Sequence, residues 1–331
     1  MKTMFGIRLL QAIGFAVAAA IVPGTASVAS AQTIKLPHCC AVDSHFDVGA
    51  KKFSELVEQK TGGKMKVRVF AGGQLGQETE VIQNVQSGTI EVTMIGHDPL
   101  AQFAPMTTIL SMPYLFKDRE QAFKLLDGAL GDRLNAALKE KGFHVLGWGD
   151  NGVRVYTNSQ RPINVPSDLA GLKIRSPQNP VNLAITKELG GIPVAMPYGE
   201  VYTAIQQHTI DGQENAVINI YPARLYEVQK FMSMTDHLMS FTVLLMSEKF
   251  YDKLAPDLRQ AVDAAGREAM QFQRQYAQKQ SSELEAKMVE KGVKVNRPNL
   301  EPFRAATKKI HVQYVGKDVP QDLYDLVTKA P

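Results

Sequence analysis

The sequence has only two cysteines, and they are neighbours, Cys39 and Cys40. Adjacent residues of a strand point to opposite faces of a sheet, so a disulfide between these two would be strained. His38 and His45 flank them, but this spacing matches no usual zinc pattern. We therefore predict no metal site here and interpret the cysteines as small, partly buried thiols on a first core strand.

The sequence also lacks the features that are typical of membrane-spanning proteins, nucleic-acid-binding proteins and several classes of enzyme. No stretch beyond the first residues is long and apolar enough to span a bilayer. No basic stripe stands out, and the formal charge falls from +4 to +2 without Lys2 and Arg8, which argues against a nucleic-acid partner. The chain has no phosphate-binding loop, no serine–histidine–acid arrangement, no metal-ligand spacing and no cofactor motif. These absences argue against an enzyme, although an arginine-lined cleft also suits a lyase.

The first 31 residues have the features of an export signal. Lys2 and Arg8 give a positive start, residues 9–22 are mostly apolar, and residues 29–31 (Ala-Ser-Ala) form a small-x-small cleavage site. We expect the mature chain to begin at Gln32 and to reside in the periplasm. The alternative is an uncleaved anchor helix.

Strand and helix patterns alternate along nearly the whole chain. Apolar residues recur at helical spacing over residues 44–60, and apolar and basic residues alternate over 65–69, as in a half-buried strand. Pro256 occupies a tolerated first-turn position and begins a predicted helix of about 35 residues. Repeated alternation favours an α/β architecture, and a mature chain of about 300 residues favours two lobes.

The lobe boundaries are expected where the chain crosses between the lobes, near Asp150, near Ser240 and within the long helix. On this prediction, lobe I comprises residues 32–150 and about 241–275. Lobe II then comprises residues 151–240 and about 276–331. The long helix braces both lobes.

Two arginines lie on predicted strands near a loop. Arg175 ends the strand 172–175, and Pro177 begins a loop directly after it, whereas Arg154 follows Gly152, which allows close backbone approach. A guanidinium is planar and always charged, so it binds a carboxylate through two parallel hydrogen bonds. The two arginines therefore indicate a site for a small organic acid, and the alternative is that they are solvated strand residues.

An aromatic side chain and an amide accompany the arginines. Tyr198 follows Pro197 at a helix entrance, where its ring is free to stack on a ligand, and Asn215 ends a predicted turn, residues 211–215. Trp148, at the end of a strand, is either a core residue or a platform for a sugar or acyl group.

Acidic residues follow strands or begin helices at several points. Ligands of two-lobed α/β proteins lie beyond the carboxyl ends of strands, where acids accept hydrogen bonds from hydroxyl groups. Each acid alone is otherwise a helix cap or a solvated charge. The candidates are Asp43, Glu78, Asp150 and, after the strand 90–95, His97 with Asp98.

Several short blocks match one protein family in the right order. They are residues 61–64, 73–76, 85–89, 112–116, 150–154, 171–175, 200–202, 211–215 and 226–230. Through these blocks the chain resembles the solute-binding proteins of tripartite ATP-independent periplasmic (TRAP) transporters, the DctP-like family. The resemblance implies a two-lobed periplasmic binding protein fold with crossing hinge strands and a long lobe-spanning helix. It also implies delivery of the ligand to integral membrane subunits of a permease, and we expect the chain itself to be a monomer without a cofactor.

The resemblance also implies residue roles. Arg175 matches the arginine that forms the main salt bridge to the ligand carboxylate, and Arg154 and Asn215 match the residues that assist it. Tyr198 matches the aromatic residue that packs on the ligand. The positions that match Asp43, Glu78 and Gln178 vary within the family and help to set specificity.

For the substrate, we favour a sugar acid such as a hexuronate or an aldonate, because several acids accompany one carboxylate-binding pair. Sialic-acid binders carry a glutamate where this chain has Gly96, and some C4-dicarboxylate binders carry a lysine where it has Arg154. A C4-dicarboxylate is the second candidate, and an aromatic or keto acid is the third. A sensory protein that presents its ligand to a receptor is a further alternative.

Overall fold

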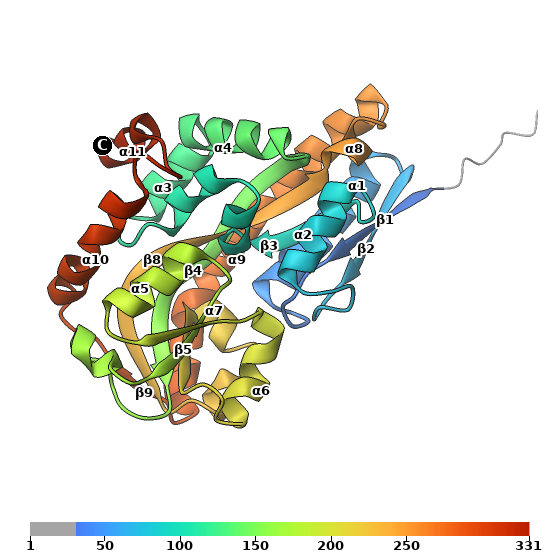
Figure 1. Cartoon of the computed structure of the whole chain (residues 1–331). Helices are drawn as coiled ribbons and strands as arrows, with labels where there is room; N and C mark the ends of the chain where they lie inside the picture. Colours follow the sequence, from blue (N-terminus) through green and yellow to red (C-terminus); the bar gives the residue numbers. More distant parts are fainter. Residues whose placement is uncertain (1–30, 331) are drawn as a thin grey trace, which may run out of the picture. The chain divides into compact units, whose positions relative to one another are not determined.

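In the computed structural model, which describes residues 31–330, a seven-stranded mixed sheet runs through the protein (Figure 1). The predicted export signal lies almost entirely outside the described residues. The strand order is β3-β8-β4-β7-β5-β6, and β9 pairs with β8. The strands are β3 (Val92–Gly96), β4 (Phe143–Asn158), β5 (Lys173–Ser176), β6 (Ile192–Ala195), β7 (Gly212–Ala216), β8 (Phe231–Ser247) and β9 (Lys294–Asn296).

Two long antiparallel strands, β4 and β8, form the centre of this sheet. Their register shifts three times, once between Asp150 and Gly152, so each strand bends and twists along its length. The sequence predicts shorter strands here, including one that carries Arg154, because polar residues and a glycine interrupt the alternation at these shifts. The predicted lobe crossings near Asp150 and Ser240 fall on these two strands.

A second, two-stranded parallel sheet consists of β1 (Gln32–Pro37) and β2 (Met65–Phe70). The sequence predicts the two cysteines on this first strand. In the structure they lie in the loop after it. The helices are α1 (His45–Lys60), α2 (Glu78–Ser87), α3 (Arg119–Leu126), α4 (Ala129–Glu140), α5 (Pro180–Glu188), α6 (Val201–Gln206), α7 (Val217–Ile220), α8 (Glu248–Tyr251), α9 (Pro256–Glu290), α10 (Glu301–Tyr314) and α11 (Gln321–Thr328).

The long helix α9 packs against α1, β4 and α7. Gly266 permits its close approach to β4, since a Cβ atom there would lie 2.6 Å from that of Leu146. The buried side chain of Gln273 binds both the backbone N–H and the carbonyl of Asp150, at 2.9 and 2.7 Å. Its amide nitrogen also lies 2.8 Å from Nδ1 of His45 on α1. Helix α9 therefore holds the middle of β4 in place.

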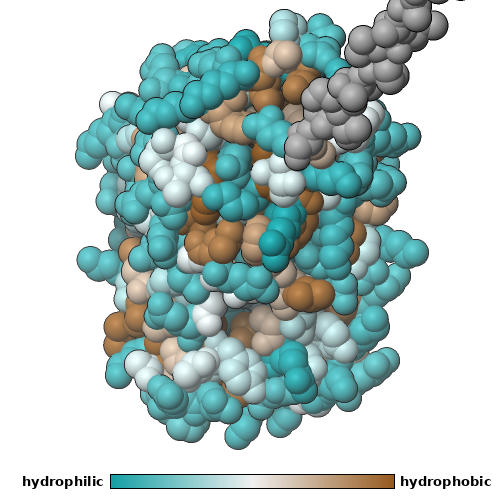
Figure 2. Space-filling model, turned by 90° about the vertical axis from the view of Figure 1, so that its right-hand side faces the viewer, coloured by the Kyte–Doolittle hydropathy of each residue, from teal (hydrophilic) through white to brown (hydrophobic). Residues whose placement is uncertain are grey.

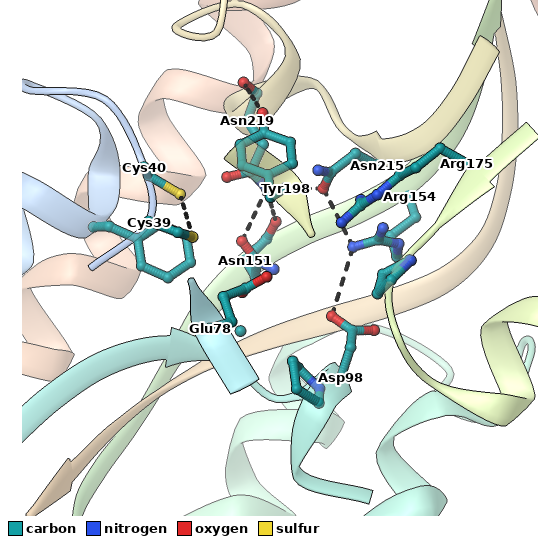
Figure 3. Close-up of a pocket in the computed structure, with 14 residues that line it drawn as sticks. Cys39, Cys40, Glu78, Asp98, Asn151, Arg154, Arg175, Tyr198, Asn215 and Asn219 are labelled. Atoms are coloured by element: carbon teal, nitrogen blue, oxygen red, sulfur yellow. Dashed lines mark hydrogen bonds and ion pairs between the residues drawn. The ribbon is translucent and has the colours of Figure 1, made fainter. Parts of the chain in front are cut away.

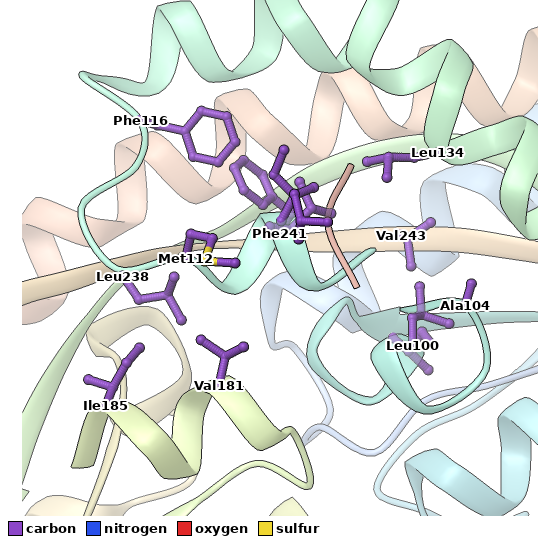
Figure 4. Close-up of a cluster of buried hydrophobic side chains, with 14 of the residues drawn as sticks. Leu100, Ala104, Met112, Phe116, Leu134, Val181, Ile185, Leu238, Phe241 and Val243 are labelled. Carbon is purple, nitrogen blue, oxygen red and sulfur yellow. The ribbon is translucent and has the colours of Figure 1, made fainter. Parts of the chain in front are cut away.

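The largest apolar cluster lies between β8 and helices α3, α4 and α5 (Figure 4). Phe241 of β8 is fully buried in it, and its ring meets that of Phe116 edge to face at a centroid distance of 5.4 Å. Leu238 of β8 and Val181 of α5 extend the cluster toward the loops that follow β3 and β5. This packing fixes the strand ends at which a ligand site is expected.

Hydrophilic side chains dominate the face shown in Figure 2, with apolar ones gathered near its middle. Within residues 31–330, no helix has both the length and the apolar character needed to cross a membrane. Two further predictions were wrong in detail. The sequence predicts continuous helix over residues 120–141, but the region forms two helices, α3 and α4, which are separated at Asp127 and Gly128. Most of the predicted turn 211–215 is strand β7.

Candidate functional site

A pocket of about 330 Å³, its mouth included, lies beyond the ends of β3, β5 and β7 (Figure 3). The starts of α1 and α2 and the 3-10 turn Tyr198–Glu200 close its other sides. The lining residues are Cys39, Cys40, Phe46, Glu78, Gly96, Asp98, Pro99, Asn151, Arg154, Arg175, Pro177, Tyr198, Asn215 and Asn219.

Arg175 is a buried cation whose charge is not paired. Its side chain is only 2% exposed, and its Nε donates to the carbonyl of Met196 at 2.9 Å. Among the described residues, it has no other hydrogen-bond partner and no ion pair. Burial lowers the pKa of Arg175, although the Glu78 carboxylate opposes this effect. The guanidinium also lies 5.5 Å from the ring centre of Tyr198, so one flat side is covered while its outer nitrogens remain available.

Arg154, by contrast, has its counter-charges within the protein. Its Nε and Nη2 donate to both carboxylate oxygens of Glu214, and Asp98 lies 3.7 Å from Nη1. Burial alone would lower the pKa of Arg154, but Glu214 and Asp98 raise it above its ordinary value. Burial likewise would raise the pKa of Glu214, but Arg154 and His237 lower it to about 2. Glu214 was not a candidate from the sequence, because residues 211–215 resemble a turn.

Three asparagines connect the walls of the pocket. The amide nitrogen of Asn219 donates to Oδ1 of Asn151 at 2.9 Å and to Oδ1 of Asn215 at 3.0 Å. The Asn215 oxygen also accepts from Arg154 and from the backbone N–H of Ala216, so its amide N–H groups are left for a ligand. Tyr198 donates its hydroxyl to the carbonyl of Asn219 at 2.8 Å. The amides therefore hold the aromatic ring in place.

Glu78 is the first residue of α2 and supplies the half-buried acid of the pocket. Burial raises the pKa of Glu78, and the nearby Asp98 carboxylate adds to this effect against the opposing charge of Arg175. Asp98 is 3% exposed and accepts a hydrogen bond from Asn182 of α5 at 3.1 Å. The pocket thus combines one unpaired cation with acids and amides that accept hydrogen bonds from hydroxyl groups.

The sequence profile of bacterial extracellular solute-binding proteins of family 7, named DctP, matches residues 38–318. The chain belongs to this family. Members of the family are transport solute-binding proteins rather than enzymes, and the resemblance seen in the sequence is thereby confirmed. The DctP-like, two-lobed α/β fold is confirmed as well, because solved structures of TRAP solute-binding proteins superpose on nearly the whole chain.

Individual relatives of this DctP-family chain carry named ligands. The 2,3-diketo-L-gulonate-binding periplasmic protein YiaO of Escherichia coli is 37% identical, and the alignment covers 82% of each chain. A TRAP solute-binding protein from Polaromonas bound to D-erythronate has a TM-score of 0.88 and 34% identity, covering 90% of this chain and 99% of that one. A TRAP solute-binding protein from Sulfurospirillum deleyianum with bound succinate has a TM-score of 0.87 and 29% identity, covering 91% of this chain and 100% of that one. These relatives all bind organic acids.

Six candidate site residues of this DctP-family protein line the pocket, and five do not. Those at the lining are Arg175, Arg154, Asn215, Tyr198, Glu78 and Asp98. The structure does not place Asp43, Gln178, Trp148, Asp150 or His97 at its lining. Asp43 is exposed and pairs with Lys51 at 3.3 Å, because its backbone turns away at a φ of 62°.

The remaining four have structural partners instead. The Nε1 of the buried Trp148 donates to Asn135 at 3.0 Å, and the buried Asp150 accepts from Arg119 at 2.8 Å. His97 lies between the backbone of Phe241 and the hydroxyl of Ser111. Gln178 accepts from Thr79 of α2 at 3.0 Å, and its carbonyl accepts from Gln102. Each of these residues therefore has a polar side-chain atom bonded to another part of the protein.

Five further residues line the pocket but were not candidates for ligand binding from the sequence, namely Cys39, Cys40, Phe46, Asn151 and Asn219. Two of the five, Asn151 and Asn219, are buried polar residues, and sequence alone gives no signal that distinguishes them from surface amides. Within residues 31–330, no group of three histidine, cysteine, aspartate or glutamate side chains is placed to hold a metal ion.

Proposed function

We propose that this chain is the periplasmic binding protein of a TRAP transporter and that its ligand is a sugar acid, such as a hexuronate or an aldonate. The observation that carries the proposal is the buried guanidinium of Arg175, which has no ion-pair partner among the described residues. A buried, unpaired charge is costly, and a ligand carboxylate removes that cost by pairing with it through two parallel hydrogen bonds.

The neighbours of Arg175 complete the carboxylate site in this proposal. Arg154 is neutralised by Glu214 and serves mainly to orient Asn215, whose free amide N–H groups donate to the ligand. Tyr198 covers one side of the Arg175 guanidinium. Water excluded from the closed pocket leaves a lower local dielectric, which strengthens the pairing.

The other side of the pocket favours hydroxyl groups over a second carboxylate. Glu78, Asp98 and the Oδ1 atom of Asn151 are acceptors, and the only unpaired cation at the lining, within the described part of the chain, is Arg175. A monocarboxylate with hydroxyl or keto groups matches this balance, as do the named ligands of the YiaO protein and the Polaromonas protein. The bound succinate of the Sulfurospirillum protein keeps a C4-dicarboxylate as the second candidate.

Hinge closure would deliver the ligand to the permease. Segments from distant parts of the chain already meet over the pocket, since His45 of α1 lies 2.9 Å from the side-chain oxygen of Asn219 in α7. Gln178 similarly joins the loop after β5 to α2. A ligand that binds the closed form better shifts the population toward it, and the membrane subunits would recognise that form.

A thermal-shift and calorimetry panel tests the proposal. The protein exported and processed from the full chain is titrated with D-glucuronate, D-galacturonate, D-galactonate, D-erythronate, succinate and L-malate. We expect a sugar acid to raise the melting temperature most. We expect Arg175→Met to weaken binding by at least about 30-fold, the usual loss when one partner of a buried charge pair is removed. A shift with succinate or malate alone would overturn the substrate, and undiminished binding by Arg175→Met would overturn the anchor.

A further inference from the structure

The two cysteines lie together in the wall of the pocket, on the side away from the arginines (Figure 3). Their Sγ atoms are 3.6 Å apart, Cys40 is buried, and Cys39 is partly exposed. Backbone hydrogen bonds hold the loop in place, from Gly72 to the carbonyl of Cys40 at 2.8 Å and from Gly73 to that of His38 at 3.0 Å. Two thiols are thus held next to each other in the ligand pocket.

We propose that Cys39 and Cys40 are a modification site, where a reversible disulfide between neighbouring residues forms one wall of the pocket and tightens ligand binding. The link to binding rests on the proposed function. The step is a thiol–disulfide exchange with a disulfide oxidant of the export compartment. One thiolate attacks the oxidant, the second thiolate breaks the mixed disulfide, and the two electrons and two protons leave with two released thiols.

The geometry makes this disulfide reversible rather than structural. The two sulfurs need to approach by about 1.5 Å to reach a bond length of about 2.05 Å, which side-chain rotation in a loop can supply. The Cα atoms of neighbouring residues are only about 3.8 Å apart, below the usual range for a disulfide, so the bond is strained. Strained disulfides have higher reduction potentials and are the labile or regulatory ones.

Glu78 connects the redox state of the cysteines to the ligand. Cys39 and Glu78 both line the pocket, and the Cys39 thiol lowers the pKa of the Glu78 carboxyl against the larger effect of burial. A disulfide has no S–H group, so oxidation removes one donor from the pocket and leaves the Glu78 carboxylate to a ligand hydroxyl. On this proposal, the reduced pair competes with the ligand for Glu78, and the oxidised pair does not.

The first experiment counts thiols, and it needs no ligand. The full chain is exported, free thiols are blocked with N-ethylmaleimide under denaturing conditions, and the intact mass is measured. We expect no label on the exported protein, two labels after dithiothreitol, and none again after the neutral oxidant bis(2-hydroxyethyl) disulfide. Two labels both after export and after that oxidant would overturn the disulfide.

The second experiment measures binding of D-galacturonate and D-erythronate by calorimetry in both redox states. We expect reduction to weaken binding about three- to tenfold, the effect of one hydrogen bond. The double variant Cys39→Ala/Cys40→Ala should respond to dithiothreitol by less than a factor of two. Equal affinities of the two wild-type states would overturn the link to binding. If neither acid binds in either redox state, both the proposed function and the link between the disulfide and binding are overturned. The thiol count still decides whether the disulfide forms.

Discussion

At the scale of single residues, the two pocket arginines have opposite predicted roles, because one is paired within the protein and the other is not. Arg154→Met leaves the buried carboxylates of Glu214 and Asp98 without their cation. We expect this change to lower the free energy of unfolding by about 3–5 kcal/mol. Arg175→Met removes a buried charge that has no counter-charge, so the ligand-free protein should be at least as stable as the wild type.

Urea denaturation of the two variants without ligand checks this pair, and each serves as the control for the other. Both substitutions replace a buried arginine of the same pocket by an apolar side chain of similar length. Equal destabilisation of the two variants would mean that Arg175 has a partner in solution. Arg175 would then not be the unpaired cation that the proposed function requires.

Glu78 is expected to make ligand binding depend on pH. Burial raises its pKa above the ordinary value of 4.5, with Asp98 adding and Arg175 opposing. The folded state therefore holds a proton that the unfolded state has already released, and stability falls as pH rises from about 4.5 through the folded pKa. A ligand carboxylate adds negative charge and raises the pKa of Glu78 further, so binding takes up a proton and affinity falls as pH rises.

Calorimetry in two buffers with different ionisation enthalpies measures that proton uptake directly. The wild type should bind the acid with proton uptake, and affinity should fall with rising pH. Glu78→Gln keeps the size of the side chain and removes the charge, so its affinity should be nearly constant over the same range. Proton uptake of the same size in Glu78→Gln would assign the effect to another group.

At the scale of secondary structure, the bend in β4 depends on Gly152. This residue has a φ of +86°, and a Cβ atom there would lie 2.7 Å from the Cβ of Ala216 on β7. Gly171 also has a positive φ, +78°, but has open space around it. Gly171→Ala should therefore cost about 1 kcal/mol from backbone strain alone, whereas Gly152→Ala should cost about 2 kcal/mol more from overpacking. Urea denaturation of the two variants measures the difference, and equal costs would exclude the clash.

The elements that were predicted well depend on local patterns. Helix α9 begins at Pro256 and comprises 35 residues, both as predicted, because first-turn chemistry and helical spacing are local. Arg175, Tyr198 and Glu78 line one pocket because each lies near the end of a strand or begins a helical turn. The ion pair between Arg154 and Glu214 joins residues 60 positions apart through the register of β4 and β7, which no local pattern reveals.

Two candidate residues that lie away from the pocket lining, Asp150 and His97, also depend on distant segments. Asp150 and His97 follow predicted strands, so strand position alone suggested ligand contact. In the structure Arg119 and Ser111, respectively, occupy their polar atoms. Sequence position therefore locates the edge of the sheet where the pocket lies, but partners from distant segments decide which side chains face the ligand. The predicted lobe boundaries stay predictions.

At the scale of the whole molecule, buried histidines join segments that are far apart in the sequence. Burial lowers the pKa of His38, His45, His97 and His311, and for His45 to about 4. His45 belongs to α1 and lies within hydrogen-bond distance of Asn219 in α7 and of Gln273 in α9. Its protonation would place a charge at the point where these three helices meet beside the pocket.

The pH dependence of stability follows from the sign of this shift. The unfolded state binds a proton below about pH 6.5, whereas the folded state resists it down to about pH 4, so stability is lost as pH falls between these values. We expect His45 to account for about 2 kcal/mol of the loss between pH 7 and pH 5. Urea denaturation at both pH values measures this loss. The free energy of unfolding of His45→Gln should fall by about 2 kcal/mol less than that of the wild type between pH 7 and pH 5. The exposed control His208→Asn should behave as the wild type, and an unchanged slope in His45→Gln would show that His45 is already charged in the folded protein.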